Sequence, residues 1–117
     1  MNTYQYTARV RYAETDQMGV VYHGNYAVYF EMGRVEWLRN LGISYKKMEE
    51  SGIMLPVVSL TMNYKKPARY DDLLTVITKF KSQTSVKIEF DYEILNENGE
   101  LLTTGYSLLV FVDMKTG

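Results

Sequence analysis

The sequence predicts an α+β domain in which one main helix covers an antiparallel sheet. Three observations lead to this fold class. Apolar residues recur every three or four positions across 25–41, which is the period of one helix face. Beyond residue 57 the period falls to two, which is the period of strands with one buried and one wet face. The long helix precedes the strands, and a lone amphipathic helix buries its apolar side across a sheet.

The first half of the chain is predicted to form a strand, a turn, the main helix and a short second helix. Tyrosines and β-branched residues favour a strand at 4–12. The apolar stripe of the main helix, 25–41, consists of Tyr26, Phe30, Gly33, Trp37 and Leu41. Gly33 costs about 1 kcal/mol against alanine inside a helix, so we expect a close approach to another backbone there. Gly42 is a stop signal for this helix, and a short second helix is predicted at 44–51.

The second half of the chain is predicted to be all strand. Strict alternation marks strands at 58–64, 74–80 and, most clearly, 86–94. Asn98-Gly99 is a strong hairpin signal. The last strand, 101–113, carries apolar residues on both faces. We therefore expect it to be covered on both sides, by the helix and a partner subunit or within a larger sheet.

Composition limits the classes of function. The 117 residues are predicted to form one domain, 1–117, long enough to bury a core. The net charge is −1 with both signs interspersed, whereas a nucleic-acid-binding protein normally shows a basic stripe. There is no cysteine and only one histidine, so no disulfide, thiolate or His-rich metal site is expected. The polar N-terminus and the lack of a long apolar stretch predict a cytoplasmic protein without a membrane span.

One stretch between the first strand and the main helix gathers the chemically useful residues. It reads Tyr12-Ala13-Glu14-Thr15-Asp16-Gln17-Met18-Gly19-Val20-Val21-Tyr22-His23-Gly24-Asn25-Tyr26 and contains the only histidine. Asp16 lies ahead of the helix N-terminus, where unpaired N–H groups and the helix dipole favour negative charge. Gly19 is expected to allow a sharp turn, because only glycine adopts positive φ cheaply. The arrangement suits chemistry in which negative charge develops on an oxygen.

The pattern Tyr12-x-Glu14-Thr15-Asp16-x-x-Gly19-Val20-Val21-Tyr22-His23-x-Asn25-Tyr26 resembles the signature of the 4-hydroxybenzoyl-CoA thioesterase family. Nearly the whole chain takes part in the resemblance, and the best match is the bacterial branch of short acyl-CoA thioesterases often associated with the Tol–Pal envelope system. The resemblance implies the hot-dog fold, an antiparallel sheet of about five strands wrapped around one long helix. It also implies an enzyme that hydrolyses acyl-CoA to free acid and coenzyme A without metal or redox cofactor.

The resemblance assigns catalytic roles to three residues, each of which also has an ordinary structural interpretation. Asp16 would be the nucleophile or the general base, although a turn or helix-capping aspartate is common. His23 would offer its backbone N–H to the thioester oxygen and its side chain to the substrate, or it is simply structural. Tyr12 matches a tyrosine implicated in this branch, or it is an ordinary strand aromatic.

The same comparison suggests residues that bind substrate. Gly24 lies where a larger side chain would block the carbonyl pocket, and Asn25 caps the helix or touches the substrate. Lys65, Lys66 and Arg69 form the densest basic cluster and would contact the phosphates of coenzyme A, or they form a solvated surface.

Two other functions remain open on the same fold. A hydroxyacyl-thioester dehydratase would pair a histidine with a carboxylate on the long helix, where Glu31 and Glu36 stand. A non-catalytic module would bind acyl-CoA or a partner without turnover. In each case we expect a homodimer or a homotetramer of dimers. The acyl chain length, and the choice between coenzyme A and acyl carrier protein, stay open.

Overall fold

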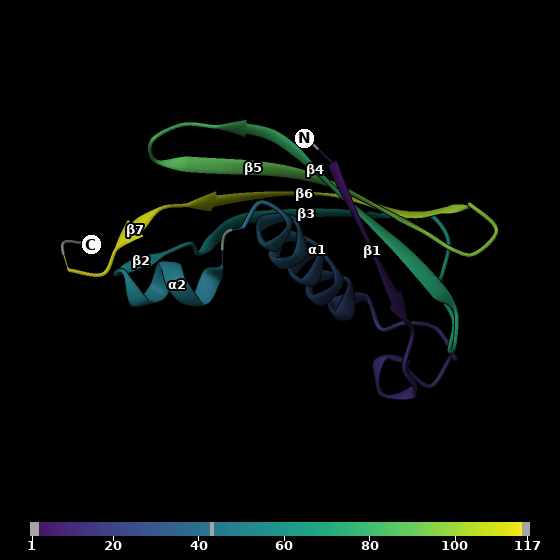
Figure 1. The fold of residues 1–117 in the computed structure, drawn as a ribbon. Helices are drawn as coiled ribbons and strands as arrows, with labels where there is room; N and C mark the ends of the chain where they lie inside the picture. Colours follow the sequence, from purple (N-terminus) through teal and green to yellow (C-terminus); the bar gives the residue numbers. More distant parts are fainter. Residues whose placement is uncertain (1–2, 43, 116–117) are drawn as a thin grey trace.

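A computed structural model describes residues 3–42 and 44–115 (Figure 1). The helical elements are η1 (Tyr12–Glu14), η2 (His23–Asn25), α1 (Tyr26–Asn40) and α2 (Tyr45–Glu50). The strands are β1 (Thr3–Arg9), β2 (Ile53–Met54), β3 (Val57–Tyr64), β4 (Leu73–Gln83), β5 (Lys87–Leu95), β6 (Leu101–Val110) and β7 (Val112–Asp113). Within these ranges no helix has the length and apolar content that a membrane crossing requires.

The main sheet has five antiparallel strands in the order β1-β4-β5-β6-β3. Figure 1 shows this sheet curving over α1, while α2 and the short β2–β7 pair lie together beyond the C-terminal end of α1. The predicted fold class, an antiparallel sheet of five strands around one long helix, is confirmed. The strands expected at 58–64, 74–80 and 86–94 correspond to β3, β4 and β5.

The apolar stripe of α1 is buried against the sheet, with one exception. Tyr26, Phe30, Gly33 and Trp37 are all buried, as predicted. The prediction that Leu41 belongs to this buried stripe is wrong, because Leu41 is 47% exposed and lies just past the end of the helix. There Gly42, with φ +83°, turns the chain away in the left-handed region that a C-terminal glycine supplies.

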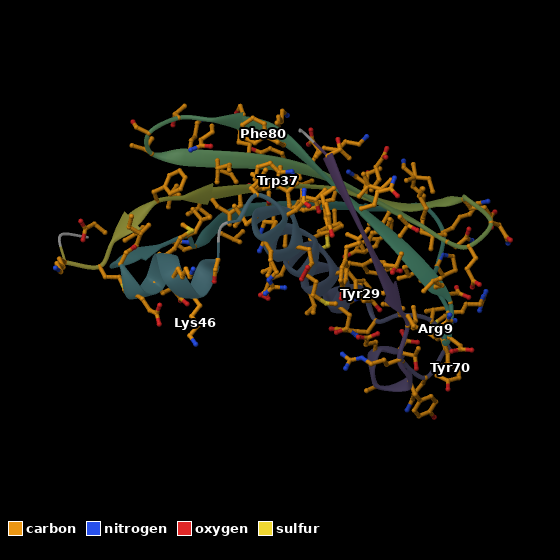
Figure 2. The ribbon with its side chains drawn as sticks, in the orientation of Figure 1. Arg9, Tyr29, Trp37, Lys46, Tyr70 and Phe80 are labelled. Atoms are coloured by element: carbon orange, nitrogen blue, oxygen red, sulfur yellow. The ribbon has the colours of Figure 1, made fainter. Side chains whose placement is uncertain are left out.

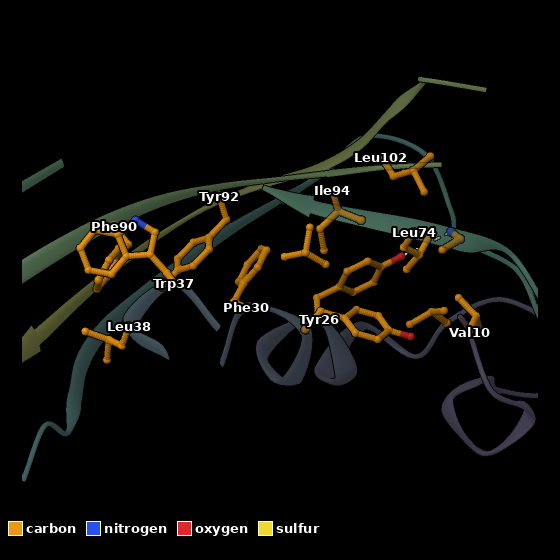
Figure 3. Packing of buried hydrophobic residues seen from close by; sticks show 14 of the residues in the cluster. Val10, Tyr26, Phe30, Trp37, Leu38, Leu74, Phe90, Tyr92, Ile94 and Leu102 are labelled. Carbon is orange, nitrogen blue, oxygen red and sulfur yellow. Dashed lines mark hydrogen bonds between the residues drawn. The ribbon is translucent and has the colours of Figure 1, made fainter. Parts of the chain in front are cut away.

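Stacked aromatic rings hold the helix to the sheet (Figure 3). The Phe30 ring lies 4.4 Å from the Tyr92 ring in a stacked arrangement. Trp37 stacks on Phe80 at 5.7 Å and meets the Phe90 ring edge-on at 5.1 Å. Each such pair is worth about 0.5–1.5 kcal/mol beyond the area it buries, so these rings fix how α1 crosses the strands.

Two predicted details of the helix and the first strand need correction. The close approach at Gly33 is real, but its neighbours are the side chains of Thr78 and Val76 on β4 rather than another backbone. The first strand ends at Arg9 instead of Tyr12, which belongs to the 3₁₀ turn η1. The strand stops because the chain turns there: the Glu14 amide donates to the Arg11 carbonyl.

The end of the chain also differs from the prediction. The last strand is two strands, because β6 ends at Val110 and Val112–Asp113 pairs separately with β2. β6 lies inside the sheet between β5 and β3. Ser107 and Leu109 are buried, whereas the alternating Leu108 and Val110 are only partly buried, so the cover expected on the second face of β6 stays a prediction. The unpaired edge on this side is β3.

The hairpin predicted from Asn98-Gly99 joins β5 to β6, as expected. Gly99 has φ +76°, and the side chain of Asn96 accepts the amides of Asn98 and Glu100, each at 3.0 Å. The asparagine side chain thus replaces backbone partners inside the turn.

Candidate active site

The motif segment folds back on itself and is hydrogen-bonded to the segment that follows β3. Thr15 pairs with Val21, and Val20 pairs with Arg69. The Val21 amide donates to the Ala68 carbonyl at 2.8 Å. These bonds place the middle of the motif, at Val20 and Val21, beside a segment more than forty residues later, at the end of the molecule where α1 begins (Figure 1).

Asp16 opens a tight turn at this place. Its amide donates to the Val20 carbonyl at 2.9 Å, and its carbonyl accepts the Gly19 amide at 3.0 Å. Gly19 has φ +79°, which confirms the predicted left-handed turn. The carboxylate oxygen Oδ1 accepts the Met18 amide at 2.8 Å. The turn-aspartate interpretation is therefore correct for one oxygen, while the exposed side chain has a second oxygen for other partners.

A cavity of about 330 Å³ opens next to this turn. Its walls come from both ends of the motif, from the start of α1 and from the segment after β3. They are formed by Asp16, Val20, Val21, His23, Tyr26, Tyr64, Lys65, Lys66 and Pro67. The fold thus brings four of the predicted site residues, Asp16, His23, Lys65 and Lys66, onto one cavity.

The sequence did not single out the two tyrosines of this wall as site residues. The sequence predicts Tyr26 as a residue of the buried helix face and Tyr64 as a strand residue. Their rings meet edge-on at 5.3 Å. The residues around Tyr64 do not indicate a site role, because Tyr64 comes near the motif only when β3 pairs within the folded sheet.

His23 begins the 3₁₀ turn that leads into α1. Helix geometry leaves the N–H groups of His23 and Gly24 without an acceptor inside that turn. The imidazole lies 4.3 Å from the Tyr22 ring and 6.4 Å from the Tyr64 ring, and the Tyr64 hydroxyl donates to the His23 carbonyl at 3.2 Å. Aromatic neighbours therefore orient a histidine that is itself exposed.

Gly24 has a clear steric reason to be glycine. A β-carbon at this position would lie 2.8 Å from the Tyr22 ring. A larger side chain at this position would therefore first meet the Tyr22 ring, and the expected effect on a carbonyl pocket stays a prediction.

Tyr12 and Arg69 do not lie on the walls of this cavity. Tyr12 is 79% exposed and meets the Tyr70 ring edge-on at 5.7 Å, at the corner of the molecule where Tyr70 is labelled in Figure 2. It shares a separate hollow with Asp16, Thr15 and Gln17. The Arg69 amide donates to Asp72 at 2.9 Å, and its side chain is exposed.

The predicted capping role of Asn25 is wrong. Its side chain makes no capping hydrogen bond. Instead, Nδ2 donates to the Glu14 carbonyl at 2.8 Å. The amide of Asn25 thus ties the helix start to the motif segment.

Glu14 was not predicted as a site residue and proves to be a buried anchor. Within the described residues, its carboxylate accepts the Arg11 amide at 2.8 Å, Arg11 Nε at 3.1 Å, Arg11 Nη2 at 2.9 Å and the Tyr29 hydroxyl at 2.9 Å. The available signal was the spacing Arg11-x-x-Glu14, in which opposite charges stand three residues apart.

The surroundings of Glu14 determine its charge. Burial by itself raises the pKa of the Glu14 carboxyl, but the hydrogen bonds from Arg11 and Tyr29 outweigh it and hold the pKa below its usual range. Burial, and then the neighbouring carboxylate, raise the pKa of Tyr29 well above its ordinary value. At neutral pH the pair is therefore an ionised carboxylate and a protonated phenol.

Neither helix carboxylate joins His23 at the cavity. Glu31 and Glu36 line a different hollow, beside Tyr6 and Met32, and Glu36 forms an ion pair with Arg39. In residues 3–42 and 44–115, no group of three or more acidic or histidine side chains gathers closely enough to hold a metal ion.

Comparison with known proteins identifies the family to which the chain is similar. The sequence profile of the Thioesterase superfamily matches residues 18–103. The chain is 42% identical to the putative acyl-CoA thioesterase YneP of Bacillus subtilis over 107 residues, which cover 92% of this chain and 78% of that protein. It is 35% identical to the acyl-CoA thioester hydrolase YbgC of Escherichia coli O157:H7 over 115 residues, covering 97% and 86%.

The chain is also similar in structure to a solved thioesterase. The chain superimposes on a DHNA-CoA thioesterase from Staphylococcus aureus with a TM-score of 0.95 and 43% sequence identity, covering 99% of this chain and 78% of that one.

Proposed function

The chain belongs to the Thioesterase superfamily and has its hot-dog fold, and from this premise we propose that it hydrolyses acyl-CoA thioesters to the free acid and coenzyme A. Similar proteins that cover most of the chain carry the names acyl-CoA thioesterase and thioester hydrolase. Within the superfamily, we assign it to the bacterial branch of short acyl-CoA thioesterases, the assignment that the motif around Asp16 supports.

One observation supports the site best. The carboxylate of Asp16 and the start of η2 at His23, seven residues apart, line the same cavity. Thioester hydrolysis needs an ionised carboxylate near the carbonyl carbon, either to attack it or to activate water. It also needs N–H donors near the carbonyl oxygen, where negative charge develops in the transition state. Asp16 would meet the first need, and the N–H groups of His23 and Gly24, which have no acceptor inside the η2 turn, would meet the second.

The substrate would extend from this point along basic and aromatic side chains. Lys65 and Lys66 are exposed at the cavity wall and are suited to the phosphates of coenzyme A. Lys66 also reaches Glu100 at 2.7 Å, so Lys65 is the more available cation. Arg69 and Tyr12 would contribute at the outer edge, where both side chains are exposed. The side chain of His23 would orient the substrate.

The dehydratase alternative is weaker. That reaction pairs a histidine with a carboxylate on the long helix, but Glu31 and Glu36 line a hollow away from His23. A non-catalytic binding module would need no carboxylate at the cavity, whereas Asp16 stands there with a free oxygen.

We further propose that two copies pair through β3. This eight-residue strand is an edge of the sheet, and all but one of its residues are exposed. Val57 and Leu60 line an apolar groove with Val28 of α1. A long, exposed, apolar edge strand is a ready template for a second chain. Tyr64 ends the same strand and lines the cavity, so the partner would lie beside the site.

A thioesterase screen tests the proposed function. The purified chain is given short, long and aromatic acyl-CoAs, the last because one similar structure is a DHNA-CoA thioesterase. Free thiol is followed with a thiol reagent, and hydration of crotonyl-CoA is measured in parallel. We expect thiol release with at least one acyl group and no hydration. Tight binding without release from a folded sample would favour the binding module, and hydration would favour the dehydratase.

A further inference from the structure

Resting on this proposed function, we propose that Glu14 is a positioning residue for the hydrolysis. Its buried carboxylate links the segment that carries Asp16 to the first turns of α1 through the hydroxyl of Tyr29. The link holds the carboxylate of Asp16 and the N–H groups of His23 and Gly24 in the relation that the reaction needs.

The contacts of Glu14 reach both sides of the motif. Its carboxylate is bonded by Arg11 on the preceding segment and by Tyr29 in α1. Its carbonyl accepts the Tyr22 amide at 3.0 Å and Asn25 Nδ2 at 2.8 Å. One residue, two positions before Asp16, is thus bonded to the residue just before the motif, to the second half of the motif and to the helix.

The chemistry of the anchor points to a need for rigid placement. Glu14 is only 8% exposed, and burying a charged carboxylate is costly unless hydrogen bonds and an opposite charge offset the cost. Arg11 supplies the opposite charge, while its guanidinium stays at the surface. A structural turn on the surface needs no buried ion, whereas a catalytic geometry loses rate when a reacting group is displaced by about 1 Å.

The variant Tyr29→Phe tests the link, because it removes the hydroxyl and keeps both the ring and the Arg11–Glu14 pair. Tyr92→Phe is the matched control. It also removes a buried tyrosine hydroxyl, but this hydroxyl bonds Ser107 and Arg34 rather than the motif segment. Truncating Glu14 to alanine would leave Arg11 and Tyr29 without their acceptor, so that variant would test folding more than placement.

Kinetics give the first readout. We expect Tyr29→Phe to lower kcat about tenfold with KM changed by less than about twofold, because the groups that bind substrate stay in place while the reacting groups lose alignment. Tyr92→Phe should keep the wild-type kcat. An equal kcat for the two variants, or a loss that merely follows the unfolded fraction, would overturn the positioning role.

Hydrogen exchange gives a second readout that does not depend on turnover. Amides in 14–25 should exchange faster in Tyr29→Phe than in the wild type or in Tyr92→Phe, because the link to the helix is lost. Unchanged exchange in that segment would also overturn the proposal. If the wild type itself has no thioesterase activity, the proposed function and the positioning role both fail. If the wild type is active and Tyr29→Phe matches it, only the positioning role fails.

Discussion

Gly33 of α1 lies directly against Thr78 of β4: a β-carbon at Gly33 would be 2.4 Å from Thr78 Oγ1 and 3.1 Å from a methyl group of Val76. The helix therefore sits on the sheet at a distance that only a glycine allows. Gly33 lies two turns into α1, so this contact also fixes the position of the helix start, and of the candidate site there, relative to the sheet.

Gly33→Ala should destabilise the protein by about 1–3 kcal/mol, because the overpacked methyl group outweighs alanine's better helix propensity. Thr78 Oγ1 is buried and has no hydrogen-bond partner among the described residues, so Thr78→Ala should cost little in polar contacts. Urea unfolding of both single variants and of the double variant measures the coupling. We expect the Gly33→Ala penalty to shrink in the Thr78→Ala background, and an equal penalty in both would contradict the steric explanation.

Asp16→Asn should reduce turnover at least about 100-fold, the usual scale for a positioned acid–base group. The amide oxygen of asparagine can still accept the Met18 amide, so the turn should persist and the melting temperature should hardly move. Thiol-release assays and thermal melts on the same preparation check both statements. If the variant keeps most of its activity, Asp16 is only a turn residue.

We expect Asp16 to attack the thioester directly. Its carboxylate would then form a mixed anhydride as the thiolate of coenzyme A leaves, and water would hydrolyse the anhydride. Rapid quench with excess enzyme should show coenzyme A released before free acid appears. In a single turnover in ¹⁸O-water, label on Asp16 would establish this route. Simultaneous release of both products, with no acylated Asp16 peptide, would assign Asp16 as the general base instead.

Glu14 should make stability depend on pH in a predictable direction. Its pKa is depressed in the folded state, so the stabilisation is fully present above the ordinary glutamate value of about 4.3 and is lost as the pH falls through the lower folded value. Glu14→Gln lacks this contribution. Urea midpoints of the two proteins should therefore differ most near neutral pH and converge on acidification. A constant difference down to acid pH would rule out this assignment.

Leu60→Asp should convert the wild-type assembly to monomers, because it places a charge in the apolar groove beside the β3 edge. Val86→Asp is the control, since Val86 is also exposed but stands before β5, away from that groove. Light scattering gives the masses. A wild-type mass of one chain in an active sample would refute the pairing, as would a Leu60→Asp variant that stays dimeric.

The sequence alone determined what depends on neighbours along the chain. The period of three to four at 25–41 and the period of two beyond residue 57 identified the helix and strands, because side-chain direction follows from local geometry. Gly19, Gly42 and Gly99 also indicated turns from the sequence, because glycine has no β-carbon and adopts positive φ cheaply. All three have positive φ. The motif with Asp16 and His23 also identified the candidate site.

Which distant groups meet depends on the packing of the whole chain. Periodicity says which face of a strand is buried but not which strand lies beside it, so the pairing of β1 with β4 and the exposed edge at β3 were not predictable. Tyr64 reaches His23 across 41 positions through that sheet. Asparagine is a common helix-capping residue, but the side-chain amide of Asn25 donates to the Glu14 carbonyl instead. The reason is physical: a polar side chain bonds whichever partner the fold brings within reach, and that competition takes place in three dimensions.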